Sequence, residues 1–102
     1  MEKFTDIIKS HTPVLVDFFA TWCGPCKMMH PVLEDLHKQM GDKARIIKVD
    51  IDQNRELAAH YNVRSVPTLM IFQDGELKFR TAGVQSAAAL KAELDKYVPV
   101  EA

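Results

Sequence analysis

The two cysteines of this chain, Cys23 and Cys26, are the residues whose type and spacing point most directly to chemistry. They lie three positions apart in the run Trp-Cys-Gly-Pro-Cys-Lys at residues 22–27. If a helix begins within this run, residues i and i+3 share one face and lie close enough for a disulfide. The start of a helix also offers unpaired backbone N–H groups and the positive end of the helix dipole, which favour a thiolate over a thiol. The spacing therefore indicates reversible dithiol–disulfide chemistry.

The same cysteines have two other readings, as small buried hydrophobic residues or as half of a zinc site. His30 extends them to a Cys-x2-Cys-x3-His pattern. A structural zinc site needs four ligands, and the chain has no third cysteine. The remaining histidines lack ligand spacing; they are His11, His37 and His60. The spacing therefore favours redox chemistry over a metal site, which stays open as the alternative at this point.

Length and composition limit the class of protein. The chain has 102 residues, 47% of them hydrophobic, which predicts a single domain over residues 1–102 with one core. Its 13 basic and 14 acidic residues give a net charge of −1, so nothing draws it electrostatically to nucleic acid or to an anionic membrane. No apolar stretch reaches the length of a signal peptide or a membrane span. We expect a cytoplasmic location, provided that no leader has been removed.

The elements around the cysteines form a predicted βαβ unit. Residues 14–20 are an almost unbroken apolar run, typical of a strand that is covered on both faces. Residues 24–40 carry apolar side chains at helical spacing, and residues 45–52 alternate as a second strand. A helix between two strands predicts that the strands are parallel. A short amphipathic helix over residues 4–10 precedes the unit.

The second half of the chain predicts a hairpin between two helices. Residues 54–61 are expected to form a short helix, and residues 68–73 and 76–81 two antiparallel strands. The Asp-Gly pair between these strands is a strong hairpin signal. Ser86 is a suitable N-cap for a last amphipathic helix. The fold class is therefore α/β.

Four short motifs follow one another in a recognisable order. They are residues 14–18 (Val-Leu-Val-Asp-Phe), residues 22–27 with Pro31 beyond, residues 48–52 (Lys-Val-Asp-Ile-Asp) and residues 64–68 (Arg-Ser-Val-Pro-Thr), accompanied by Gly75 and Gly83. In this pattern the chain resembles the thioredoxin family over nearly its whole length. The resemblance implies a thioredoxin fold, in which a central mixed β-sheet of about four strands is flanked by about four helices.

The chain departs from the family in two places. The usual N-terminal strand is missing or very short, because the chain starts too late to supply it. The strand at residues 45–52 would then be a sheet edge, so we expect a monomer, with an edge-strand dimer as the alternative. Phe19 stands where the family commonly has tryptophan, which leaves Trp22 as the only indole.

The resemblance implies a general protein disulfide reductase that is recharged by an NADPH-dependent thioredoxin reductase. Its other partners would be many disulfide-containing proteins. The protein itself would bind no cofactor, and NADPH and FAD would act only through the reductase. Two alternatives stay open: a redox-switched binding subunit of a partner enzyme, and a thiol oxidant or isomerase.

Within that chemistry the cysteines take different roles. Cys23, at the helix start and reachable by solvent, is the expected nucleophile, and Cys26, one turn further and more buried, the resolving residue. The resemblance makes Asp17 the buried proton acceptor for Cys26, with Lys48 as its modulator. A bridging or capping aspartate and a solvated lysine are the ordinary alternatives. His30 would tune Cys26 or be a merely packed or half-exposed histidine.

The resemblance also implies a surface that recognises substrates. The bond between Val66 and Pro67 would be cis, against the usual preference for trans, and the backbone of Val66 would pair with an extended substrate. The members of this surface would be Trp22, Gly24, Pro25, Val66, Pro67, Gly83 and Val84.

Overall fold

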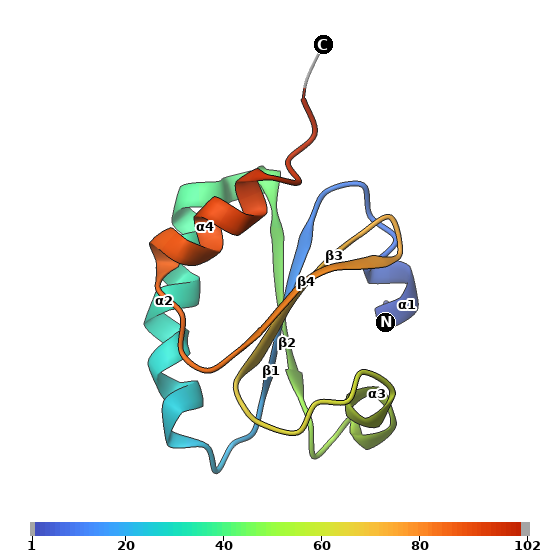
Figure 1. Cartoon of the computed structure of the whole chain (residues 1–102), viewed down its shortest axis with the longest axis vertical. Helices are drawn as coiled ribbons and strands as arrows, with labels where there is room; N and C mark the ends of the chain where they lie inside the picture. The colour runs from blue at the N-terminus through green and yellow to red at the C-terminus, as the bar shows by residue number, and fades with distance from the viewer. Residues whose placement is uncertain (1, 101–102) are drawn as a thin grey trace.

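The computed structural model describes residues 2–100; residues 1, 101 and 102 of the expected domain lie outside the described residues. Four helices flank one four-stranded sheet in this part of the chain (Figure 1). The helices are α1 (Phe4–Ile7), α2 (Gly24–Met40), α3 (Arg55–His60) and α4 (Ala87–Asp95), with a 3-10 turn at Gly41–Lys43. The strands are β1 (Val14–Phe19), β2 (Arg45–Asp50), β3 (Thr68–Gln73) and β4 (Glu76–Ala82). No helix within residues 2–100 is long and apolar enough to cross a membrane.

The sheet is mixed and has the order β2-β1-β3-β4. Strands β1 and β2 are parallel and are connected through α2, which confirms the predicted βαβ unit. Strand β3 pairs antiparallel with both β1 and β4, which confirms the predicted hairpin. As expected, β2 lies at an edge of the sheet.

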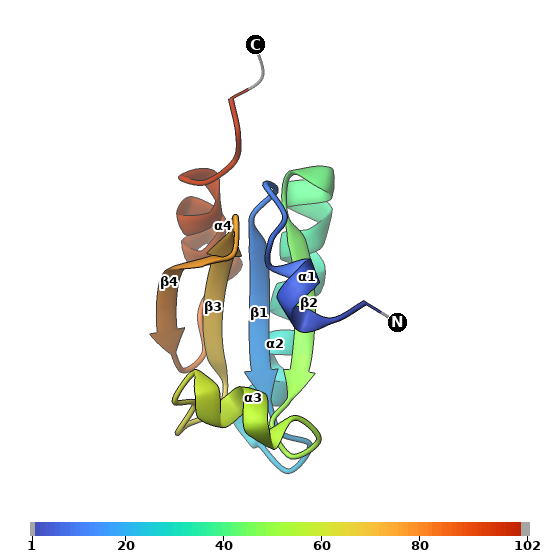
Figure 2. The same cartoon turned by 90° about the vertical axis from the view of Figure 1, so that its right-hand side faces the viewer.

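Helices cover both faces of the sheet. Helices α2 and α4 lie on one face, and α1 and α3 on the other (Figures 1 and 2). Strand β1 supplies both cores, because successive side chains of a strand point to opposite faces. Leu15 packs with Leu36 of α2 and Leu94 of α4, whereas Phe18 packs with Phe4 and other apolar residues on the opposite face. The central strand therefore positions the loop that follows it from both sides.

Some element ends differ from the prediction. The helix expected over residues 4–10 ends at Ile7, because the carbonyl groups of Ile8 and Ser10 accept hydrogen bonds from the β3–β4 turn instead. The strand expected over residues 45–52 ends at Asp50, whose side chain accepts the backbone N–H of Asp52 and starts a turn. In both cases a contact outside the element decides where it ends.

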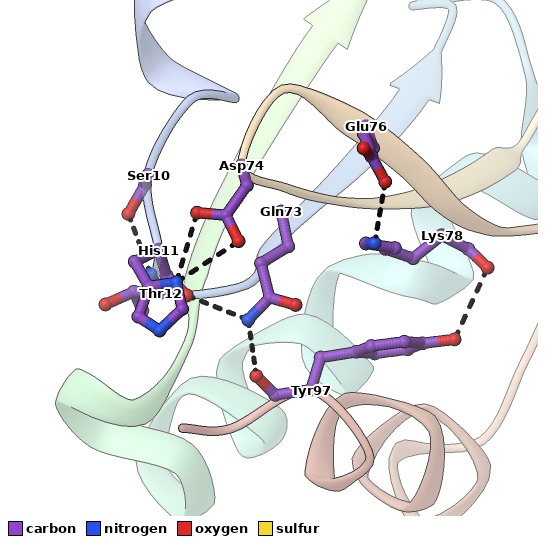
Figure 3. Close-up of polar contacts among 8 residues, drawn as sticks. All are labelled: Ser10, His11, Thr12, Gln73, Asp74, Glu76, Lys78 and Tyr97. Carbon is purple, nitrogen blue, oxygen red and sulfur yellow. Dashed lines mark hydrogen bonds and ion pairs between the residues drawn. The ribbon is translucent and has the colours of Figure 1, made fainter. Parts of the chain in front are cut away.

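A polar network closes the end of the sheet opposite the cysteines (Figure 3). The buried Gln73 donates from Nε2 to the carbonyl oxygens of His11 and Tyr97, at 2.8 Å and 2.6 Å. His11 Nδ1 lies 3.1 Å from an Asp74 carboxylate oxygen, and the Tyr97 hydroxyl donates to the Lys78 carbonyl. These bonds tie the loop before β1 to the hairpin and to the end of the C-terminal helix.

Candidate active site

The cysteines lie where β1 gives way to α2. Cys23 is the N-cap of α2, and its Sγ accepts the backbone N–H of Cys26 at 3.1 Å. The two residues are joined by a disulfide with their Cα atoms 5.3 Å apart, as the spacing predicted. Pro25 stands in the first turn, where its missing N–H removes no helical bond. The helix start thus places a backbone donor directly on the Cys23 sulfur.

The expected difference in exposure between the cysteines is wrong for the disulfide-bonded protein. Cys23 is 4% exposed and Cys26 5%, so neither is the more accessible residue. Both sulfur-bearing side chains cluster with Ala20, and Phe19 and Val66 pack against that cluster. Any difference in reactivity between the cysteines must therefore come from their positions in the helix and from neighbouring charge.

The loop before β3 contacts the disulfide from a distant part of the sequence. The carbonyl oxygen of Val66 lies 3.6 Å from Cys23 Sγ, and the bond between Val66 and Pro67 is cis. Pro67 is buried, and its carbonyl accepts the backbone N–H of Gly83 at 2.9 Å. The structure therefore places Val66 beside Cys23, and Gly83 beside Pro67, the residue that follows Val66.

The other residues expected to recognise substrates are accessible. Trp22 is 69% exposed and Val84 43%, and Gly24 and Pro25 are also exposed. The Trp22 indole N–H donates to an Asp52 carboxylate oxygen at 2.9 Å, which holds the ring from the segment after β2. Sequence reasoning missed Asp52, because the two residues are thirty positions apart and no pattern relates them.

Asp17 lies in the interior, as its apolar neighbours predicted. It is fully buried, and neither carboxylate oxygen has a hydrogen-bond partner among the described residues. It pairs in register with Leu69, which belongs to the core under α2 and α4, so its side chain shares the sheet face that α2 covers. Burial raises the pKa of Asp17 from 3.8 to about 6, and the positive charge of Lys48 opposes part of this rise.

Lys48 stands beside Asp17 in the neighbouring strand. The two residues are register partners between β1 and β2. The Lys48 ammonium lies over the Phe19 ring, 4.7 Å from its centroid, in a cation–π arrangement. Phe19 thereby fixes the position of the cation that acts on Asp17.

A pocket of about 430 Å³ opens next to Cys26. Its walls come from the end of β1 and the segment after it, the first turns of α2 and the middle of β2. The lining residues are Phe19, Ala20, Thr21, Cys26, Lys27, His30 and Lys48. His30 is exposed, and its Nε2 lies 3.0 Å from a Glu34 carboxylate oxygen one turn along the helix. A larger cavity of about 680 Å³, between α1 and α3, contains neither cysteine.

No group of three or more histidine, cysteine, aspartate or glutamate side chains could hold a metal ion in the part of the chain that the structure describes. His30 therefore adds no third or fourth ligand to the cysteine pair. The arrangement suits disulfide exchange: a sulfur at a helix start, a second sulfur bonded to it, and a buried carboxyl on the sheet face below the helix.

Comparisons with known proteins agree with this chemistry. The family model described as Thioredoxin matches residues 1–96. The chain is 47% identical over 95 residues to a thioredoxin of Mycobacterium tuberculosis, covering 93% of this chain and 82% of that protein. It is 45% identical over 96 residues to a "Bifunctional thioredoxin reductase/thioredoxin" of Mycobacterium leprae, covering 94% of this chain and 21% of that protein.

Solved structures agree as well. A mutant thioredoxin from Halobacterium salinarum superposes with a TM-score of 0.85 at 42% identity, covering 96% of this chain and 85% of that chain. Family, fold and the cysteine pair at the start of α2 together identify a protein dithiol–disulfide oxidoreductase. The chain belongs to the thioredoxin family.

Proposed function

We propose that this oxidoreductase is a general protein disulfide reductase, recharged by an NADPH-dependent thioredoxin reductase. The observation that carries the proposal is the disulfide at the N-terminus of α2, with the Cys23 sulfur in the N-cap position. The Mycobacterium leprae relative supports the reductase as partner, because its name joins a thioredoxin reductase and a thioredoxin in one protein. Gly24 and Pro25 between the cysteines are typical of the reducing members of the family.

The first step belongs to Cys23. In the reduced protein the Cys26 N–H and the helix dipole would stabilise a Cys23 thiolate. This thiolate attacks a substrate disulfide, whose S–S bond breaks as a mixed disulfide forms and one substrate thiolate leaves. Cys23 is the nucleophile because of its place in the helix and not because it is the more exposed cysteine.

The second step belongs to Cys26 and Asp17. Cys26 attacks the Cys23 sulfur, forms the disulfide and releases the second substrate thiolate. Because the cysteines are already side by side, this step is effectively intramolecular. Asp17 takes the proton of the Cys26 thiol, directly or through water, and its raised pKa of about 6 suits a proton acceptor near neutral pH. Lys48 modulates this step by favouring the ionised carboxylate.

Substrates would bind across the exposed residues around Cys23. The backbone of Val66, beside the Cys23 sulfur, is placed to pair with an extended substrate segment. Trp22, Gly24, Pro25 and Val84 would add apolar contact with little shape selectivity, together with Pro67 and Gly83 at the edge of the loop. Such a surface fits a reductant that serves many proteins.

We expect the protein to work as a monomer. Strand β2 has one neighbour within residues 2–100, and its other edge carries the exposed side chains of Arg45 and Lys48. Arg45 also pairs with Glu2, with 2.6 Å between Nη2 and Oε1. Charged side chains along an edge discourage pairing with a second copy. Sedimentation equilibrium tests this expectation.

Two variants test the disulfide reductase. In cell extract, Cys26→Ser should accumulate mixed disulfides with many proteins on Cys23, because the resolving step is lost. Cys23→Ser, the matched control, should accumulate almost none. A single partner that stays bound when both cysteines are replaced would favour the binding-subunit alternative.

The direction of electron flow needs its own measurement. We expect NADPH and a thioredoxin reductase to reduce the Cys23–Cys26 disulfide repeatedly while a protein disulfide is consumed. Equilibration with glutathione buffers gives the potential of the pair. A value near that of strong thiol oxidants, about −120 mV, would contradict the proposal.

A further inference from the structure

The pocket beside Cys26 carries an unbalanced charge. Three basic side chains line it, Lys27 and His30 from α2 and Lys48 from β2, and no aspartate or glutamate is among its lining residues. The other lining residues are Phe19, Ala20, Thr21 and Cys26, of which Phe19 and Ala20 form apolar walls. A concave site with apolar walls and two lysine ammonium groups is suited to a small anionic ligand.

Two carboxylates lie near the basic side chains, but neither lines the pocket. Glu34 pairs with His30 from outside the lining, at 3.0 Å, and both side chains are well exposed. Asp17, the register partner of Lys48, is buried and does not line the pocket, and its charge offsets part of that of Lys48 once it is ionised. Lys48 is held over the Phe19 ring, so one cation has a fixed place at the pocket. The positive charge at the pocket therefore comes from both α2 and β2.

We propose that this pocket binds a carboxylate of a low-molecular-weight acidic disulfide, and that such disulfides are a substrate class of this protein. The inference rests on the proposed disulfide exchange at Cys23 and Cys26. The volume of about 430 Å³ lies in the range of small-ligand sites and is too small for a folded partner. Because the pocket adjoins the disulfide, a carboxylate held there keeps the attached sulfur close to the reacting cysteines.

The reaction balances without any further reactant. The Cys23 thiolate attacks one sulfur of the acidic disulfide, whose S–S bond breaks, and the first acidic thiolate leaves. Cys26, losing its proton, attacks Cys23 Sγ and releases the second acidic thiolate. Two electrons pass from the protein dithiol to the substrate, and the two protons of the dithiol account for the two thiols formed.

A charge-reversal pair tests the pocket. Pre-reduced protein is mixed with dithiodipropionate, which carries two carboxylates, or with neutral bis(hydroxyethyl) disulfide, and oxidation is followed by the fluorescence of Trp22, which directly precedes Cys23. His30→Glu places a negative charge at the pocket. His37→Glu makes the same change on an exposed position of the same helix, away from the pocket lining.

The expected result is selective. His30→Glu should slow oxidation by dithiodipropionate about fivefold, in line with the modest strength of solvent-accessible charge pairs, and change the neutral reaction less than twofold. His37→Glu should change both reactions less than twofold. His30→Lys, which places a cation at the pocket, should not slow the reaction with the acidic disulfide.

Two results would overturn the pocket while leaving disulfide reduction intact. Equal effects of His30→Glu and His37→Glu on the acidic disulfide would mean that its rate depends on the overall charge of the protein and not on binding in the pocket. Equal slowing of the acidic and the neutral disulfide by His30→Glu would mean a change in thiol reactivity. If wild-type protein reduced neither disulfide, the small-disulfide substrate class would fail, whereas the absence of protein mixed disulfides on Cys26→Ser would contradict the proposed function.

Binding can be measured without any redox step. Thiodipropionate has the same two carboxylates on a thioether, which cannot exchange, and thiodipropanol is its neutral counterpart. In the disulfide-bonded protein, thiodipropionate should cause saturable changes in the amide resonances of Thr21, Lys27 and His30, and thiodipropanol should not. The absence of saturable changes at these residues would refute the pocket, whatever the activity on disulfides.

Discussion

The buried carboxyl of Asp17 should make the stability of the protein depend on pH in a defined way. Its pKa is raised from 3.8 in an ordinary environment to about 6 in the folded protein, because burial disfavours the charged form. Between these two values the folded protein binds more protons than the unfolded chain. The free energy of unfolding therefore falls as the pH rises from about 4 to 6, as far as Asp17 is concerned.

The size of this effect follows from the shift. A rise of roughly two pKa units, at ~1.36 kcal/mol per unit, amounts to about 3 kcal/mol of lost stability once the pH is well above 6. Asp17→Asn keeps the shape of the side chain and removes its titration. The buried amide has its own desolvation cost, on the order of 1–3 kcal/mol, but that cost is the same at every pH. The variant should therefore gain about 2 kcal/mol relative to wild type between pH 4 and pH 8.

The assay is urea unfolding of the disulfide-bonded proteins at several pH values from 4 to 8. The control variant Asp6→Asn removes an exposed carboxylate. Between pH 4 and pH 8 its stability relative to wild type should change by less than about 0.5 kcal/mol. A stability difference between Asp17→Asn and wild type that stays constant over this pH range would refute the reasoning. It would mean that Asp17 does not titrate between 4 and 6.

Four further outcomes are expected. Lys48→Met should raise the pKa of Asp17 above its value in the wild type, because it removes the cation that lowers this pKa. The measurement is the unfolding free energy as a function of pH, whose fall should extend to higher pH than in the wild type. Ser86→Ala should cost about 1 kcal/mol of unfolding free energy, because Ser86 Oγ accepts the Ala89 N–H at the start of α4. Leu36→Ala should cost about 2–5 kcal/mol in the same assay, since Leu36 is fully buried. Gly83→Ala should cost about 1 kcal/mol or more of unfolding free energy, because φ is +90° at this residue. For Ser86→Ala, Leu36→Ala or Gly83→Ala, an unchanged unfolding free energy would contradict the reason given for that variant.

Most of the fold could be predicted because its elements have strong periodic patterns. The apolar run of β1, the helical spacing of α2 and the Asp-Gly turn after β3 each depend on neighbouring residues alone. The ends of α1 and β2 were predicted less well. The carbonyl groups of Ile8 and Ser10 bond to the hairpin, and no local pattern announces a bond to residues more than sixty positions away.

In the candidate site, too, local features could be predicted and contacts between distant segments could not. The disulfide partners and the burial of Asp17 follow from spacing and from apolar neighbours. The exposure of Cys23 could not be predicted correctly, since Val66 and Phe19 cover the sulfurs from other segments. The contact between Trp22 and Asp52 has no sequence signal either.

The sequence by itself determined that this protein has one redox pair, at the start of a helix, in an α/β domain of the thioredoxin family. It did so because spacing, helix geometry and hydrophobic periodicity are local properties. Only the tertiary structure decided that Lys48 stands beside Asp17 and that three basic side chains line one pocket next to Cys26. Those relations depend on strand register and on packing between segments, which arise when distant parts of the chain are brought together.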